Sequence, residues 1–323
     1  MSSEDRHGAR AAAGPGNLRL AVASGGTRRG RWLVLGAAFF WGTSATLARH
    51  LFRDHHVPAL QVVEVRLTIA SLLLGGWLAL RSPERLRIEW RDLPDLVVLG
   101  LFGVAAVQGS YYYAVSSLGV GLAILLQYIA PALILLYTAL RGEHLPPLAI
   151  IAVLAAIAGT ALLVWNTNSQ IHAPPLAWAV GFGSAFIFAF YIVFSKRALR
   201  RHRAETVLFY TFAIASLFWW LIIPPWTIVN AHYGRDLWLL FAVLGIGSTL
   251  IPFGLFYAGL RTLDPPQAGI LATAEPVIAV LSAWLLLGES LHPVQWLGAA
   301  LVLAASAIAS NTPERVIAEA ERA

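Results

Sequence analysis

The sequence predicts an all-α integral membrane protein with ten transmembrane helices, arranged as two inverted five-helix repeats. Three observations carry this prediction: the composition, the spacing of apolar runs and the similarity of the two halves. Hydrophobic residues make up 58% of the 323 residues and charged residues only 12%, about half the charged share of a soluble domain. A soluble fold of this length cannot bury so much apolar surface, and a disordered chain needs the opposite composition.

Ten apolar runs are close to the length of about 20 residues that a helix needs to cross the hydrocarbon core. They cover residues 32–51, 58–80, 94–115, 119–140, 146–165, 175–197, 205–224, 236–259, 265–287 and 292–310. The spacers between them are short and carry the Pro and Gly residues typical of turns. No spacer has room for a soluble domain.

The basic residues predict the orientation. We expect residues 1–30 to form a disordered basic cytoplasmic tail and residues 311–323 a short cytoplasmic tail. With the N-terminus inside, only Arg49, Arg53 and Arg235 of the 23 Lys and Arg residues fall outside, Arg66 lies within a span, and the other 19 are inside. Cytoplasmic loops carry such an excess, so both termini are predicted to be cytoplasmic. The net charge of +6 then indicates contact with an anionic lipid leaflet rather than with nucleic acid.

The two halves of the chain resemble each other. Tyr112, Leu118 and Pro131 align with Tyr257, Leu263 and Pro276 at a constant offset of 145 residues. The segments Gly142–Pro147 and Gly288–Pro293 align one residue further on. The predicted repeats are residues 32–165 and 175–310. Because each holds five spans, an odd number, the second repeat enters the membrane inverted, which is the architecture of many secondary transporters.

Four motifs resemble the EamA type of the drug/metabolite transporter superfamily. They are Trp41-Gly42-Thr43 in the first span, Arg66-Leu67 with Ala70 in the second, Leu126-Gln127-Tyr128-Ile129-Ala130-Pro131 in the fourth, and Glu275-Pro276-Val277 with Leu287-Gly288-Glu289 in the ninth. Their order and spacing cover residues 32–310. The resemblance implies a secondary transporter of the bacterial inner membrane that exports small metabolites such as amino acids by alternating access. It leaves open a carrier for sugars or nucleotide-sugars.

Away from the span ends, the predicted spans contain three charged residues. Glu275 is near mid-depth of the ninth span, where a charge is costly and usually faces a cavity. Glu64 and Arg66 share the second span, but two residues are about 200° apart on a helix, so they point to opposite faces. Transport is predicted either to be coupled to proton exchange through Glu275 or Glu64, or to have no coupling. Each residue also has a structural alternative. Glu275 could bond a neighbouring helix, and Arg66 could form an ion pair or donate hydrogen bonds to helix carbonyls. Glu64 could extend to the outer membrane interface.

Aromatic residues at mid-depth are the candidates for substrate binding or gating. The mid-depth aromatic residues are Trp41, Tyr111, Tyr112, Tyr113, Tyr128, Phe188, Tyr191 and Tyr257. The preferred candidates among them are Trp41, Tyr112, Tyr128, Tyr191 and Tyr257, with the polar Gln127 beside Tyr128. Packing between helices is the alternative role. The tryptophans near span ends are predicted to face the membrane interface; they are Trp32, Trp90, Trp165, Trp226, Trp238 and Trp296. Pro131 and Pro276 occupy equivalent points of the two halves, which predicts hinges near a transport site.

Other function classes are disfavoured. The chain has no cysteine, which excludes thiolate metal sites and disulfides, and the histidines lack the spacing of metal ligands. No phosphate-binding loop or nucleophile elbow occurs, so no cofactor and no ATP-driven step are expected. A membrane-embedded enzyme acting on lipid predicts acid and base residues near one interface, whereas the ionisable groups here lie near mid-depth. The substrate, the direction of net flux and the oligomeric state are left open by the sequence.

Overall fold

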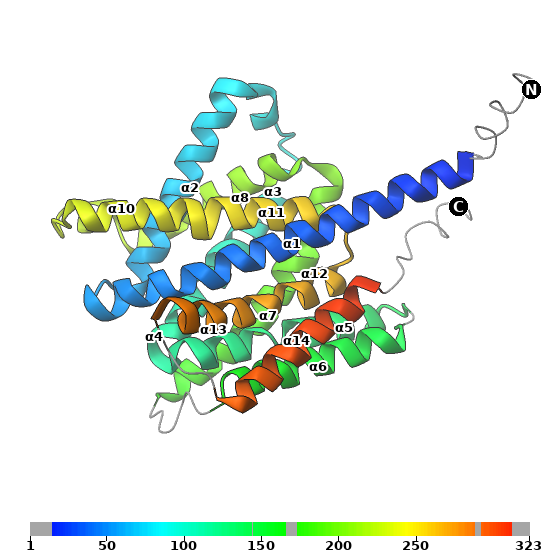
Figure 1. Cartoon of the computed structure of the whole chain (residues 1–323). Helices are drawn as coiled ribbons and strands as arrows, with labels where there is room; N and C mark the ends of the chain where they lie inside the picture. Colours follow the sequence, from blue (N-terminus) through cyan, green and yellow to red (C-terminus); the bar gives the residue numbers. More distant parts are fainter. Residues whose placement is uncertain (1–14, 144, 166–172, 288–291, 312–323) are drawn as a thin grey trace, which may run out of the picture.

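In the computed structural model the chain is a bundle of tilted helices (Figure 1). The structure describes residues 15–143, 145–165, 173–287 and 292–311, and every regular element in these ranges is a helix. Residues 1–14 and 312–323 of the two predicted tails lie outside the described part. Six helical stretches are long and apolar enough to cross a membrane, at 59–81, 93–140, 175–201, 204–222, 235–260 and 293–310.

Each predicted span corresponds to one helix or to helices in line. The first half comprises α1 (Pro15–Asp54), α2 (Ala59–Arg81), η1 (Pro83–Leu86), α3 (Leu93–Val98), η2 (Leu99–Ala105), α4 (Ala106–Gln127), α5 (Ala130–Leu140) and α6 (Pro147–Leu163). The second comprises α7 (Pro175–Arg201), α8 (Ala204–Ile222), α9 (Pro225–Val229), α10 (Arg235–Leu244), η3 (Gly245–Leu250), α11 (Ile251–Leu260), α12 (Pro265–Ala272), α13 (Ala274–Leu287) and α14 (Pro293–Asn311). Gly119, whose φ of 80° suits glycine, turns the chain between the third and fourth spans.

The expectation of a disordered tail over residues 1–30 is wrong for its second half. α1 begins at Pro15 and runs for 40 residues, about twice the length that crosses a bilayer. Proline suits the first turn of a helix, and no second proline follows to interrupt it. The N-terminal part of α1 therefore extends beyond the rest of the bundle (Figure 1).

The two halves repeat each other in local structure. η2 and η3 are both π-helical stretches and start 146 residues apart, at Leu99 and Gly245. The fourth span breaks between α4 and α5, and the ninth breaks between α12 and α13. Pro131 and Pro276 lie in the first turn of the half-helix that follows each break, so the two interruptions occupy equivalent positions.

Contacts between helices follow the same exchange of halves. α1, the first span, packs on α11 and α13, which belong to the eighth and ninth spans. α7, the first span of the second half, packs on α4 and α5, which belong to the third and fourth. α2 pairs with α8, and α6 pairs with α14 along one edge of the bundle (Figure 1). Swapping the two repeats maps this set of contacts onto itself, as an inverted repeat requires.

Polar side chains cross-link one end of the bundle, which we call the basic end: residues 81–95, 196–206 and 260–263. Arg85 bonds Glu205 at 3.2 Å, and Arg201 lies 3.7 Å from Asp92. The Lys196 Nζ donates to the carbonyls of residues 260, 261 and 263 at 2.8, 3.1 and 2.7 Å. α1 starts and α14 ends on this side (Figure 1). The second, sixth and eighth spans therefore end at the basic end. The first span begins on the same side of the bundle.

The outer surface of the bundle is apolar. Leu72, Phe102, Leu154, Phe186 and Leu221 are each at least half exposed, as expected for side chains that face lipid. The six tryptophans predicted near span ends are all exposed, between 41% and 79%.

Candidate functional site

The two broken helices meet near the centre of the bundle. Tyr128 occupies the break between α4 and α5, and Glu275 lies in the first turn of α13, after the break at Thr273. The Tyr128 hydroxyl donates a hydrogen bond to the Glu275 carboxylate at 2.6 Å. A carboxylate in the first turn of a helix is also stabilised by the helix dipole. A tyrosine of the first half of the chain thus holds a carboxylate of the second half.

Arg66, buried on α2, is anchored to the π-helical stretch η3. Its Nε donates to the Thr249 hydroxyl at 3.0 Å and its Nη2 to the Ser248 carbonyl at 3.1 Å. The guanidinium also stacks on the Tyr112 ring, 4.9 Å from its centroid, a favourable cation–π contact. Three contacts from two spans therefore fix the guanidinium in place.

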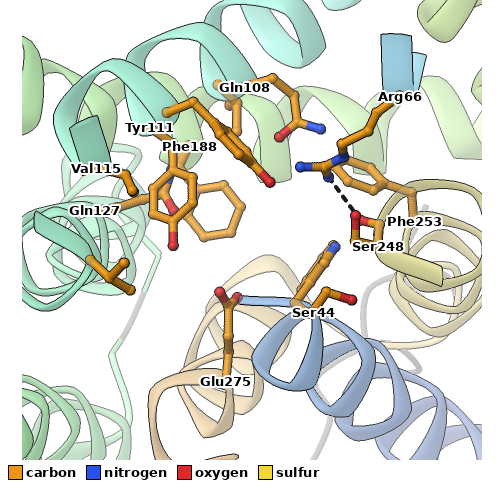
Figure 2. Close-up of a pocket in the computed structure, with 14 residues that line it drawn as sticks. Ser44, Arg66, Gln108, Tyr111, Val115, Gln127, Phe188, Ser248, Phe253 and Glu275 are labelled. Carbon is orange, nitrogen blue, oxygen red and sulfur yellow. Dashed lines mark hydrogen bonds between the residues drawn. The ribbon is translucent and has the colours of Figure 1, made fainter. Parts of the chain in front are cut away.

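Arg66 and Glu275 line the same cavity, from separate elements (Figure 2). No ion pair within 4.0 Å joins these two residues, both of which the structure describes. The other lining residues come from both halves of the chain: Trp41, Ser44, Val107, Gln108, Tyr111, Tyr112, Val115, Val120, Gln127, Phe188, Ser248 and Phe253. The cavity volume of about 70 Å³ is far below the roughly 300–1,000 Å³ of sites for drug-sized ligands.

Three N–H groups in the cavity wall have no partner in the described part of the protein. They belong to Arg66 (Nη1), Gln108 (Nε2) and Gln127 (Nε2). Their side chains are 2%, 5% and 7% exposed, so bulk water does not reach them freely. A buried unpaired donor costs about 1–3 kcal/mol, and such groups are rare enough to indicate a ligand. The wall is therefore richer in donors than the protein itself uses.

The cavity lies in the half of the bundle away from the basic end. Arg66 is the eighth residue of α2, which starts at the opposite end, and Val120 directly follows the turn at Gly119. Towards the basic end the space is filled by rings, which we call the aromatic plug: Phe188, Tyr191, Phe212, Phe253, Phe256 and Tyr257. Neighbouring ring centroids are 5.5–6.1 Å apart, within the range of favourable aromatic pairs.

The sequence profile of the EamA-like transporter family matches the chain twice, over residues 28–165 and 176–311. The chain belongs to the EamA-like transporter family. It is accordingly a multi-pass membrane transporter with two family repeats.

Individual relatives agree with this assignment. An inner membrane transporter of Salmonella typhimurium, YicL, is 28% identical over 90% of this chain and 98% of its own length. A transporter of Archaeoglobus fulgidus is 30% identical over 87% of this chain and 96% of its own length. The threonine/homoserine exporter RhtA of Escherichia coli is 28% identical over 81% of this chain and 84% of its own length. A crystal structure with 22% identity superposes with a TM-score of 0.70 over 91% of this chain and 99% of the other, which shows a shared fold.

Five of the residues predicted for the site line the cavity of this EamA-like transporter. They are Trp41, Arg66, Tyr112, Gln127 and Glu275. Tyr128 lies directly behind Glu275 as its hydrogen-bond donor. The transporter therefore brings together residues from the first, second, third, fourth and ninth spans, as their predicted depth requires.

Two predicted binding tyrosines lie elsewhere. Tyr191 and Tyr257 are fully buried in the aromatic plug, stacked at 5.9 Å, and the Ser195 hydroxyl donates to the Tyr257 hydroxyl at 3.1 Å. Neither lines the cavity in this conformation, so the structure gives no support for substrate contact by either residue. A gating role for them stays a prediction.

Glu64 is neither in the cavity nor at the interface. It is 2% exposed, and its carboxylate accepts a hydrogen bond from Thr68 at 3.2 Å. Thr68 in turn lies 2.6 Å from Ser216 and accepts from Trp220 at 2.9 Å, both on α8. The expected interfacial position is wrong because α8 covers this face of α2 with polar partners.

Three polar residues of the site, Ser44, Gln108 and Ser248, were not predicted from the sequence. Gln108 carried a usable signal, since a glutamine within an apolar span needs partners that lipid lacks. The Ser248 carbonyl had no such signal, because its role depends on the π-helical geometry of η3. Stretches of this kind are frequent at functional sites.

Proposed function

We propose that this transporter exports small amino acids from the cell by alternating access, with the cavity between the two repeats as its substrate site. The observation that carries the proposal is a pair of opposite charges, Arg66 and Glu275, that face one small cavity without pairing with each other. Intramembrane charges are expensive and usually serve transport. The two repeats would rock about this site, and Pro131 and Pro276 mark the breaks where they bend.

The basic end is proposed to be cytoplasmic, with both termini inside, because it carries the excess of Arg and Lys. The cavity then lies in the outer half of the membrane and the aromatic plug in the inner half. This arrangement corresponds to an outward-facing conformation. A Cys substitution at exposed Asn230 should react with an impermeant thiol reagent added to intact cells, and one at exposed Arg200 should not. The reverse labelling would overturn the orientation.

L-Threonine and L-homoserine are the first substrates to test, because a relative that matches most of the chain is a threonine/homoserine exporter. The small cavity volume favours ligands of this size over nucleotide-sugars. The purified protein in proteoliposomes loaded with one candidate should exchange it for labelled substrate outside. Exchange of sugars or nucleotide-sugars, with none of amino acids, would overturn the proposed substrate class.

Coupling to protons is proposed to pass through Glu275, since this carboxylate lies in the cavity where a proton and a substrate compete for the same oxygens. Glu275→Gln should abolish the dependence of threonine flux on the pH gradient. Glu64→Gln is the matched control, because Glu64 is also a buried carboxylate but lies between α2 and α8. Loss of the pH dependence in Glu64→Gln alone would move the coupling to that residue.

A further inference from the structure

The separation of Arg66 and Glu275 constrains the charge of a ligand. Each is fixed by partners other than the opposite charge: Arg66 by Ser248 and Thr249, and Glu275 by Tyr128. In a site of low dielectric, a ligand with one charge would satisfy one residue and leave the other without its counter-charge. A ligand with both charges, placed between them, satisfies both.

The Arg66 end of the cavity offers two N–H groups. Thr249 and Ser248 use the Nε and Nη2 of Arg66, which leaves Nη1 without a protein acceptor. The Nε2 of Gln108 also has none. In Figure 2 the Gln108 amide and the Arg66 guanidinium both point toward the same part of the cavity that they line. Two donors that face one part of the cavity, one of them charged, match the two oxygens of a carboxylate.

The Glu275 end offers acceptors. An ionised carboxylate has about four acceptor positions, and the Tyr128 hydroxyl occupies one of them. The Glu275 side chain points into the cavity from the side opposite Gln108 (Figure 2). An ammonium group carries three donors and no acceptor, so it complements this end and not the Arg66 end.

From this geometry we infer that an amino acid binds as a zwitterion in one orientation, with its carboxylate at Arg66 and Gln108 and its ammonium at Glu275. The inference rests on the proposed function and names the ionic form and the orientation of the substrate. Gln108 becomes a specificity-determining residue that reads the carboxylate together with Arg66.

The test uses three ligands that differ by one charge each. L-Threonine carries both charges, threoninamide lacks the carboxylate, and 2,3-dihydroxybutyrate lacks the ammonium. Their inhibition constants are measured against labelled threonine in proteoliposomes. The wild-type transporter should bind both analogues at least about tenfold more weakly than threonine, because each leaves a charged hydrogen bond unmade.

Gln108→Glu is the main variant, because no protein partner holds the Nε2 that it removes. The new carboxylate should weaken threonine and dihydroxybutyrate at least about tenfold and leave threoninamide unchanged or tighter. Gln108→Met should produce a smaller loss of the same two ligands. Glu275→Gln should show the crossed pattern, with threonine and threoninamide weakened and dihydroxybutyrate spared. A loss of correct folding does not generate crossed selectivity.

Two results would overturn the assigned orientation while the proposed function stands. In the first, Gln108→Glu and Glu275→Gln each weaken all three ligands equally. In the second, each of these variants shows the pattern expected for the other. A wild-type transporter that exchanges no amino acid at all would overturn the proposed function, and this inference with it. The wild-type measurement therefore separates the two failures before any variant is made.

Discussion

The half of the bundle that holds the cavity and the half that holds the aromatic plug differ in how they use polar groups. Around the cavity, the buried N–H groups of Arg66, Gln108 and Gln127 lack protein partners. Around the plug, rings pack on rings, and Lys196 donates to three carbonyls at the end of α11. The unpaired donors around the cavity are available to a ligand, whereas the plug half, in which the Tyr191 hydroxyl also lacks a partner, is held mainly by ring packing and by cross-links between helices.

The repeat makes this difference informative. The two halves of the chain have the same helix order and equivalent breaks, yet the tight cross-links gather at the basic end. At the opposite end, a hydrogen bond from Tyr233 to Gln61 at 2.5 Å links the loop before α10 to α2. A transporter that alternates between two states must break one set of contacts and form the other. In the proposed mechanism, the plug and its cross-links are the contacts that would have to open.

The largest effect is expected from removing the central ring of the plug. Tyr191 contacts Phe188, Phe253, Phe256 and Tyr257. Tyr191→Ala should lower the free energy of unfolding by about 3–5 kcal/mol, the cost of a large cavity in a packed core. Thermal unfolding of the purified protein measures it. Tyr191→Phe keeps the ring and should unfold near the wild-type temperature; an equally large loss in that variant would contradict a role in packing.

The next effect tests the support of the cavity. A Cβ on Gly42 would lie 2.7 Å from the Glu275 carbonyl oxygen and 2.8 Å from Ile278, so Gly42→Val must push α13 away from α1. A shift of about 1 Å in a positioned group can lower activity about 100-fold, and we expect a loss of this order in threonine flux. Gly76 has no atom within 4 Å of such a Cβ. Gly76→Val should therefore transport normally, and a similar loss there would show a general effect of valine.

The sequence was sufficient for the fold because the determining signals are local. Apolar runs of about 20 residues defined the spans, and the offset of 145 between Tyr112 and Tyr257 revealed the repeat. The start of α1 at Pro15 was missed because an Arg-rich, Gly-containing segment has no apolar run, although it forms a continuous helix. Composition describes what lies in the membrane better than how far a helix extends outside it.

The site was predicted in part. Depth along each span grouped Trp41, Tyr112 and Glu275, which all line the cavity, since depth follows from counting residues. Depth does not determine which way a side chain points, so Tyr191 was placed in the cavity although it faces the plug. The opposite faces of Glu64 and Arg66 followed from helix geometry, but the polar partners of Glu64 on α8 depend on tertiary packing.

The smallest expected effect concerns the cross-links at the basic end. Lys196 lies on α7, and its three bonds to the carbonyls of residues 260, 261 and 263 join α7 to the end of α11. A cation at a helix C-terminus is favourable, and Lys196→Met should cost about 1–2 kcal/mol of stability. The neighbouring Arg197 is 60% exposed and lies 3.8 Å from Asp95, so Arg197→Met should change stability by well under about 1 kcal/mol. In the proposed mechanism the Lys196 bonds hold the plug side shut. Lys196→Met should then also make a Cys placed at Ser195, which is buried beside Tyr257, react faster with a permeant thiol reagent. Unchanged labelling of that Cys, with the stability loss present, would assign Lys196 to helix packing and remove it from the closure of the basic end.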